Sequence, residues 1–140
     1  MTTRAFIDTN VLVYAIDDGE PAKQRQARAL LAGAAPGSLV ISAQVLGELY
    51  VVATGKLGIA VETAAALIDD LRPLPVVAID AGLVASAITT SRSAQLSYWD
   101  ALIVEAAALG GCRRLLTEDL ADGATIAGVS ISNPFRQASA

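Results

Sequence analysis

The sequence contains no histidine among its 140 residues. This absence excludes Ser-His-Asp and Cys-His catalytic triads, nucleases that use a histidine base, and zinc sites with histidine ligands. The chain also lacks the motifs Gly-x-x-x-x-Gly-Lys and Gly-x-Gly-x-x-Gly, which bind the phosphates of nucleotides. If the protein is an enzyme, carboxylate groups must carry its chemistry, together with a hard metal ion.

Cysteine and long apolar runs are also scarce. The single cysteine, Cys112, cannot form an internal disulfide, which fits a reducing cytoplasm and predicts a small buried hydrophobe. No apolar run approaches the roughly 18 to 20 residues that span a bilayer. Asp8 interrupts the only N-terminal stretch that could form the apolar part of a secretory signal. We therefore expect a cytoplasmic protein with no membrane attachment.

The composition is that of a folded, rather apolar protein. Hydrophobic residues make up 54% of the chain and charged residues 17%, which excludes disorder and is typical of a protein with an apolar, self-associating surface. The length predicts one compact domain over residues 1–140. The net charge of −4 argues against general adhesion to nucleic acid or to anionic membranes.

Short β-rich runs alternate with longer helical patterns along the chain. Strands are predicted at residues 4–8, 38–42, 75–80, 113–117 and 129–135, the last as an edge strand broken by Pro134. Helices are predicted at residues 21–33, 43–54, 61–72, 81–93 and 99–110, with Ser42 and Asp80 as N-caps. Strands separated by helices of crossover length predict an α/β fold, a three-layer α/β/α sandwich with a mostly parallel central sheet.

Polar residues interrupt the apolar N-terminal run "RAFIDTNVLVYAI" at Asp8, Thr9 and Asn10. Asp8 is expected to end the first strand, and in open α/β sheets ligands bind beyond the carboxyl ends of the strands. Asp8 is therefore a candidate catalytic residue, with a helix cap or an Asx turn as the structural alternative. Thr9 is expected to be a turn residue. Asn10 could make the same local hydrogen bonds as Asp8, or hold a metal-bound water or a phosphate oxygen.

Glu48 lies within the predicted helix "AQVLGELYVVAT". It falls on the shoulder of the apolar stripe that Val45, Leu49 and Val52 form at helical spacing. We therefore expect Glu48 to be half-buried, and a half-buried glutamate needs a partner. That partner is either a functional site or an arginine in an ordinary salt bridge; alternatively, the side chain extends along the apolar surface and places its carboxylate in solvent.

Asp100 follows Ser97 by three residues, so a capping box is one explanation of this acid. The helix that it begins, "DALIVEAAAL", is apolar nearly all round. Asp100 shares its face with Ile103, Val104 and Ala107, so its carboxylate is expected to point along a buried face. Both explanations remain open at this point.

Asp119 follows the predicted strand "RRLLT". If the extended conformation persists, Leu115, Thr117 and Asp119 lie on the same side of the chain. Glu118 and Asp122 are rival acids nearby, and an ordinary loop aspartate is the structural alternative.

Four candidate acids thus share a placement, since two lie at strand ends and two on helices against apolar surface. Carboxylates that crowd together repel one another, and each must gain a proton or share a cation. Mg²⁺ and Mn²⁺ prefer oxygen ligands and keep bound water, which suits a site without histidine. The sequence therefore favours metal-assisted phosphoryl chemistry, in which one or two ions activate a water molecule against a phosphodiester.

Four blocks in this order and spacing resemble the PIN-domain nucleases, and most closely the VapC-type toxins of bacterial toxin–antitoxin pairs. The resemblance spans nearly the whole chain and is carried by "FIDTNVLVYA", "ISAQVLGELY", "LSYWDALIVEAA" and "LLTEDLADG", with "ISNPF" at the end.

The resemblance implies a metal-dependent endoribonuclease that cleaves RNA with a metal-activated water. It implies an acidic quartet around Mg²⁺ or Mn²⁺, made of Asp8, Glu48, Asp100 and Asp119. Asn10 matches the polar position beside that quartet, and Thr117 matches the hydroxyl residue before the last acid. The family also implies a homodimer and a small cognate antitoxin whose C-terminal segment occupies the site.

Other function classes remain as alternatives. A receiver-like signalling module needs a late lysine, whereas the only lysines are Lys23 and Lys56. A catalytically silent PIN-like scaffold that binds RNA or protein would keep the same motifs, and a DNA nuclease would use the same chemistry. In an acidic protein, RNA affinity is expected to depend on a local basic groove, for which Arg25, Arg28 and Arg92 are candidates.

Overall fold

The centre of this computed structural model, which describes residues 3–136, is a six-stranded sheet with the strand order β3-β2-β1-β4-β6-β5. Neighbouring strands are parallel, except that β5 runs antiparallel to β6. The strands are β1 Ala5–Ile7, β2 Leu39–Ser42, β3 Val76–Val77, β4 Arg114–Leu116, β5 Thr125–Ile126 and β6 Val129–Ser132. The mostly parallel sheet confirms the predicted α/β class.

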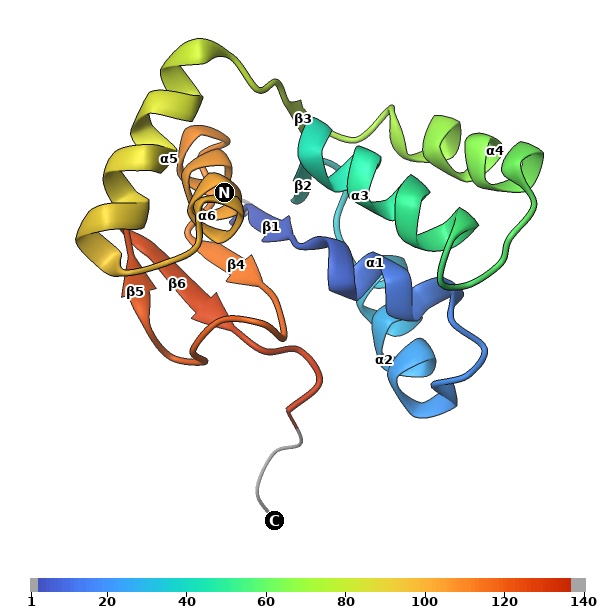
Figure 1. Cartoon of the computed structure of the whole chain (residues 1–140). Helices are drawn as coiled ribbons and strands as arrows, with labels where there is room; N and C mark the ends of the chain where they lie inside the picture. Colours follow the sequence, from blue (N-terminus) through green and yellow to red (C-terminus); the bar gives the residue numbers. More distant parts are fainter. Residues whose placement is uncertain (1–2, 137–140) are drawn as a thin grey trace.

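Helices lie on both sides of this sheet, which gives the predicted three-layer α/β/α arrangement (Figure 1). On one side α5 and α6 pack against each other, and on the other side lie α1 to α4. The helices are α1 Thr9–Ile16, α2 Pro21–Ala32, α3 Ala43–Thr54, α4 Val61–Leu71, α5 Ala81–Ala94 and α6 Tyr98–Leu109. No helix in the described part of the chain is long and apolar enough to cross a membrane.

The core explains why the strands are continuous apolar runs. Strand β1 lies between β2 and β4, and its Phe6 and Ile7 are at most 1% exposed. Helix α6 is buried on several sides, as its all-round apolar sequence predicts. It ends at Gly110, where a Cβ atom would stand 3.0 Å from Val40 Cγ1 and 3.1 Å from Val77 Cγ2. A glycine at this position therefore lets the end of the helix approach the sheet.

Local signals in the sequence place most helix starts correctly. Pro21 occupies the first turn of α2, and the side chains of Ser42, Asp80 and Ser97 accept hydrogen bonds from the first turns of α3, α5 and α6.

Cys112 is 5% exposed, and burial raises the pKa of its thiol to about 11. This confirms the interpretation of Cys112 as a small buried hydrophobe.

Helix α1 is an element that the sequence analysis does not assign. Its residues include Val11, Val13 and Ile16, whose β-branched side chains lower helix propensity. Burial of Val11 and Leu12 in the core stabilises the helix in spite of this composition. Tertiary packing, and not local propensity, therefore decides the conformation of the chain immediately after Asp8.

The prediction for the last strand is wrong in one respect. Strand β6 is not an edge strand, because it lies between β4 and β5, and it ends at Ser132 before Pro134. The edge is β5, joined to β6 by a tight turn through Ala127 and Gly128, both with positive φ. Two positive φ angles are the backbone of a type I′ hairpin. A two-residue strand and an alanine in such a turn leave little pattern for the sequence analysis to detect.

The parallel central strands are followed by polar residues that lie together at the carboxyl ends of the strands, which form one edge of the sheet. Asp8 follows β1, Ser42 ends β2 and Thr117 follows β4. Because β1 pairs with both β2 and β4 in parallel, the residues at these strand ends lie at the same edge. This edge carries the candidate site.

Candidate active site

Asp8 stands at the junction between β1 and α1. Its backbone is extended, and its Oδ1 accepts a hydrogen bond of 2.7 Å from the backbone N–H of Thr9. The residue is only 7% exposed. The helix-cap interpretation of Asp8 is therefore correct as far as it goes, but it accounts for only one of the two carboxylate oxygens.

The second oxygen of Asp8 faces Thr117. Ile7 pairs with Leu116, and the Asp8 N–H donates to the Leu116 carbonyl at 3.0 Å, so the residues after the two strands lie side by side. The fully buried Thr117 hydroxyl donates to Asp8 Oδ2 at 2.8 Å. The sheet register thus joins two predicted site residues that are far apart in the sequence.

Asn10 links Asp8 and Thr117 to Asp119. Its Nδ2 donates to Thr117 Oγ1 at 3.1 Å and to Asp119 Oδ2 at 3.1 Å, and it lies 3.4 Å from Asp8 Oδ2. Its Oδ1 accepts from the Glu118 N–H at 3.3 Å, which defines the orientation of the amide. The Asp119 N–H in turn donates to Thr117 Oγ1 at 3.1 Å. Four of the six predicted site residues therefore form one hydrogen-bonded network.

Glu48 reaches this network through a neighbour. Its Oε1 accepts a hydrogen bond of 2.9 Å from the hydroxyl of the buried Thr9. The expectation that Glu48 is half-buried is wrong, because the buried stripe of α3 is formed by Val45, Leu49 and Ala53 and leaves Glu48 exposed. Glu48 thus faces the site from solvent, and its partner is a hydroxyl group instead of an arginine.

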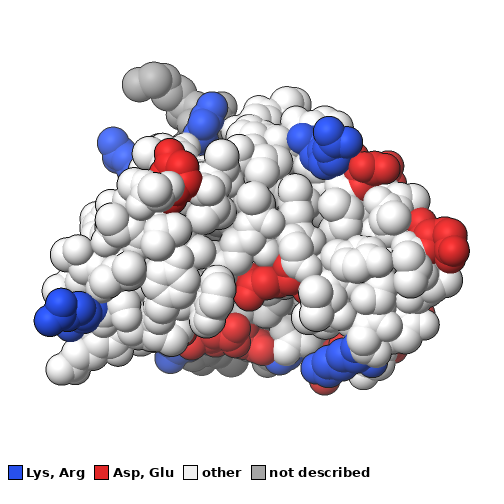
Figure 2. Space-filling view, turned by 45° about the horizontal axis from the view of Figure 1, so that its top comes forward, with Lys and Arg blue, Asp and Glu red and all other residues white. Residues whose placement is uncertain are grey.

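Asp100 occupies the first turn of α6 and is partly buried. Its backbone N–H donates to Ser97 Oγ at 3.1 Å, which confirms Ser97 as the cap. No hydrogen bond within residues 3–136 joins the Asp100 carboxylate to the other predicted acids, and across this range no three acidic or cysteine side chains are close enough to share a metal ion as they stand. Figure 2 shows some acidic side chains in the hollowed middle of one face, while other acidic side chains and the basic ones lie nearer the outline.

The electrostatics of the network single out Asp8. Burial raises the pKa of Asp8 to about 6, although hydrogen bonds from Thr117 and from the Thr9 N–H oppose this shift. The negative charges of Asp119 and Glu48 raise it further. No cationic side chain of the described residues pairs with Asp8. A buried carboxylate that lies near two further acids and accepts from a hydroxyl group suits a bound hard cation.

The rival acids in the loop after β4, Glu118 and Asp122, make their side-chain contacts outside this network. Glu118 accepts hydrogen bonds from the Tyr14 hydroxyl at 2.5 Å and from Lys23 Nζ at 2.6 Å. Asp122 accepts from the Asn133 N–H at 2.9 Å and pairs with Arg136 at 2.6 Å. Of the three carboxylates in this loop, only that of Asp119 therefore joins the network of Asp8, as the resemblance to PIN-domain nucleases implies.

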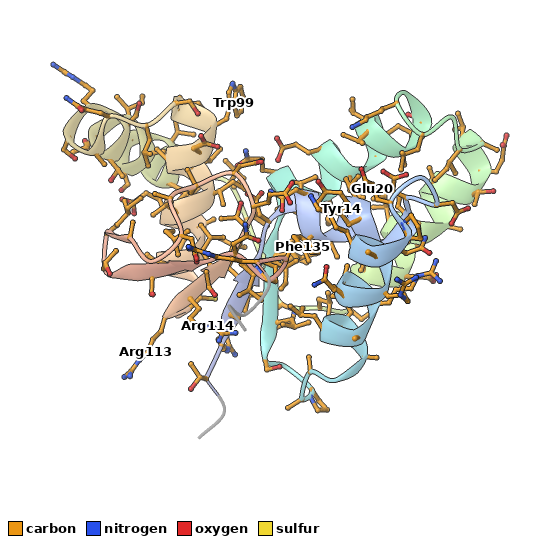
Figure 3. The ribbon with its side chains drawn as sticks, turned by 90° about the horizontal axis from the view of Figure 1, so that it is seen from below. Tyr14, Glu20, Trp99, Arg113, Arg114 and Phe135 are labelled. Atoms are coloured by element: carbon orange, nitrogen blue, oxygen red, sulfur yellow. The ribbon has the colours of Figure 1, made fainter. Side chains whose placement is uncertain are left out.

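A small group of residues supports the site without having been predicted. Lys23 lies 4.6 Å above the centre of the Tyr14 ring, and Tyr14 packs edge-on against Phe135 with ring centres 4.8 Å apart (Figure 3). Together with Glu118 these residues attach α1 and α2 to the β4 loop. No local pattern in the sequence signals the group, because it joins four separate segments of the chain.

An open cleft of about 320 Å³ adjoins the network. Its walls include Asn10 and Asp119 from the network, Thr9 beside it, and Lys56 just after the end of α3. The network is therefore accessible from solvent on this side.

A comparison with protein families identifies the domain. The family model for the PIN domain matches residues 5–121, which include all six predicted site residues. The chain belongs to the PIN domain family. This PIN domain matches no curated protein by sequence.

Solved structures with the same fold include toxins. The PIN domain is similar to a chain of a toxin–antitoxin complex from Klebsiella pneumoniae, with 22% identity over 95% of this chain and 99% of that one and a TM-score of 0.73. It is similar to VapC20 from Mycobacterium tuberculosis, a toxin that cleaves the sarcin–ricin loop, with 23% identity over 82% and 91% of the two chains and a TM-score of 0.67. A DNA-bound VapBC2 complex from Rickettsia felis gives 21% identity, 94% and 98% coverage and a TM-score of 0.64.

Proposed function

We propose that this PIN domain is a metal-dependent endoribonuclease and the toxin of a type II toxin–antitoxin pair. The observation that carries the proposal is the network of Asp8, Asn10, Thr117 and Asp119 at the carboxyl edge of the sheet, with Glu48 attached through Thr9. The fold shared with a toxin that cleaves the sarcin–ricin loop supports the same assignment.

The roles of most site residues follow from their contacts, and the role of Asp100 follows from the resemblance to PIN-domain nucleases. Asp8, Glu48, Asp100 and Asp119 would hold Mg²⁺ or Mn²⁺, which when bound supplies Lewis acidity and lowers the pKa of water near the phosphodiester. Asn10 and Thr117 orient the carboxylates of Asp8 and Asp119 by donating hydrogen bonds to them. These donors also reduce the repulsion between the two acids when no cation is present.

The test is cleavage of total cellular RNA by the purified protein in Mg²⁺, in Mn²⁺ and in EDTA. Wild-type protein is expected to give discrete fragments only with a divalent metal. Asp8→Asn and Asp100→Asn are expected to lower the rate by more than about 100-fold, because loss of a ligand exceeds the cost of losing a residue that supports one. Asp69→Asn, the same chemical change at an exposed position on α4, is the matched control and should cleave normally.

Other outcomes would select the alternatives. A folded protein that binds RNA equally well in EDTA and yields no product would be a PIN-like scaffold. Cleavage of DNA in preference to RNA would retain the metal chemistry but refute the ribonuclease. Activity that persists in Asp8→Asn would refute the assigned site.

The proposal includes two protein partners. A cognate antitoxin is expected because the similar structures include toxin–antitoxin complexes. A homodimer is expected because large apolar side chains are exposed, among them Trp99 at 62% and Leu109 at 64% on α6. Light scattering at increasing protein concentration tests the dimer, and inhibition of cleavage by the product of an adjacent gene tests the antitoxin.

We place the protein in the cytoplasm, since its one cysteine is a buried free thiol.

A further inference from the structure

The cleft beside the network connects the acids to a lysine. We call it the side cleft, and its walls include Asn10 and Asp119 at the network and Val52 and Lys56 on and after α3. The side cleft is open and has a volume of about 320 Å³. A bound strand could therefore enter the cleft from solvent and reach the acids.

Two lysines lie near this cleft, and only one has a free charge. Lys23 is 2.6 Å from Glu118 Oε2 and 3.2 Å from the Tyr14 hydroxyl, so its charge is compensated within the protein. Lys56 is exposed, and within residues 3–136 the structure gives it no ion pair. The ammonium group of Lys56 is thus available to an anion in the side cleft.

The arginines considered from the sequence do not form such a contact. Arg25 and Arg28 lie on α2 and Arg92 on α5, on opposite sides of the sheet (Figure 1), and none of them lines the side cleft. The Arg28 Nε also donates to the Ala15 carbonyl at 2.8 Å. The cleft therefore has a cation, but it is a lysine that local sequence patterns do not identify.

Charge explains why one cation at this place matters. An RNA strand carries a negative charge at every phosphate, and the network presents the acids Asp8, Asp119 and Glu48. Phosphates that flank the reacting one would be repelled by these acids unless the protein offers a positive charge nearby. The described residues that line this cleft also include the acids Asp17 and Glu118, and Lys56 is the one basic side chain among them that offers such a charge.

We propose that the side cleft is the path of the RNA strand and that Lys56 binds a backbone phosphate flanking the phosphodiester that is cut. This inference rests on the proposed ribonuclease function and adds a substrate contact to it. Lys56 is a binding residue, so its removal should weaken the affinity for RNA and leave the chemistry at the acids intact.

The experiment measures binding and cleavage separately. Binding of a fluorescein-labelled, single-stranded RNA 20-mer of mixed sequence is followed by anisotropy in EDTA at several salt concentrations. Lys56→Gln is expected to raise the dissociation constant about fivefold at low salt. It is also expected to reduce the slope of log affinity against log salt by about 0.7, the value for one phosphate of a single strand. In Mg²⁺, KM should rise while kcat stays unchanged.

The matched control is Arg113→Gln, which removes the same charge at the other end of the strands, beside the amino end of β4. Arg113 precedes β4, whereas the network follows that strand, and Figure 3 shows Arg113 and Arg114 pointing away from Tyr14. The control variant should bind and cleave RNA as the wild type does.

Each remaining outcome overturns a defined part of the reasoning. If wild-type protein binds and cleaves RNA but Lys56→Gln keeps the same affinity and salt slope, the side cleft is not the path, and the ribonuclease stands. If Lys56→Gln and Arg113→Gln lose affinity equally, the effect is one of net charge and the assigned contact is refuted. If wild-type protein neither binds nor cuts RNA, the proposed function and this inference fail together.

Discussion

The strongest quantitative prediction concerns Asp8→Asn in the absence of metal. Because Asp8 is buried, its pKa is raised to about 6 from an ordinary value of 3.8. One pKa unit corresponds to about 1.4 kcal/mol, so ionised Asp8 lowers the free energy of unfolding by about 3 kcal/mol at pH 8. The stability that the protonated group provides is complete below the unfolded-state pKa near 4. It is lost as the pH rises through about 6.

The amide variant removes this charge but disturbs the hydrogen bonds. Thr117 Oγ1 already accepts from Asn10 Nδ2 and from the Asp119 N–H, and it donates to Asp8 Oδ2. An amide NH₂ facing the hydroxyl would leave the Thr117 O–H without an acceptor, which costs about 1 to 2 kcal/mol. We therefore expect Asp8→Asn to be more stable than wild type by about 1 to 2 kcal/mol at pH 8. At pH 4 it should be less stable by about 1 kcal/mol.

The assay is urea unfolding followed by circular dichroism in EDTA, at intervals from pH 4 to pH 8. The quantity that tests the reasoning is the difference between variant and wild type, because the titration of acids that do not interact with Asp8 cancels in it. This difference should change by about 2 to 3 kcal/mol across the range, with most of the change below pH 6. A difference that does not vary with pH would show that burial does not perturb Asp8, and would refute the electrostatic account of the site.

Three further predictions concern the rest of the structure. Lys23→Met should lower the free energy of unfolding by about 1 kcal/mol at pH 7, since the ion pair with Glu118 is partly exposed and screened by solvent. Partial burial alone would raise the pKa of Glu118, but hydrogen bonds from Lys23 and Tyr14 lower it. In urea titrations the destabilisation caused by Lys23→Met should therefore shrink below about pH 4, where Glu118 takes up a proton. An unchanged destabilisation would contradict the pairing. Gly110→Ala should cost about 1 to 3 kcal/mol, because the new Cβ would crowd Val40 and Val77, and an unaltered melting temperature would show that the helix end can shift. Mn²⁺ at about 100 times its dissociation constant should stabilise wild-type protein by about 2.7 kcal/mol and Asp8→Asn far less; equal shifts in melting temperature would place the ion elsewhere.

Local patterns predict much of the site and fail at identifiable points. Asp8 and Asp119 could be found because an acid at the end of an apolar strand is conspicuous, and parallel strands bring such ends together. Thr117 was assigned only through the resemblance to PIN-domain nucleases. The burial of Glu48 could not be predicted, since neighbouring positions on a helix differ by about 100° and the stripe of α3 runs through Ala53 instead of Val52. Helix α1 was missed because burial outweighs its poor helix propensity.

By itself, the sequence determined the α/β class, the order of most strands and helices, the caps at Ser42 and Asp80, and the exclusion of histidine-based catalysis. These features depend on residues a few positions apart or on composition, where periodicity and local hydrogen bonding act. Only the tertiary structure decided that Asn10 and Thr117 bridge two acids, that Glu118 turns away to Lys23, and that Lys56 shares a cleft with Asp119. The hydrogen bond from Thr117 to Asp8 joins residues 109 positions apart, and such a contact exists only once strand pairing has set the register.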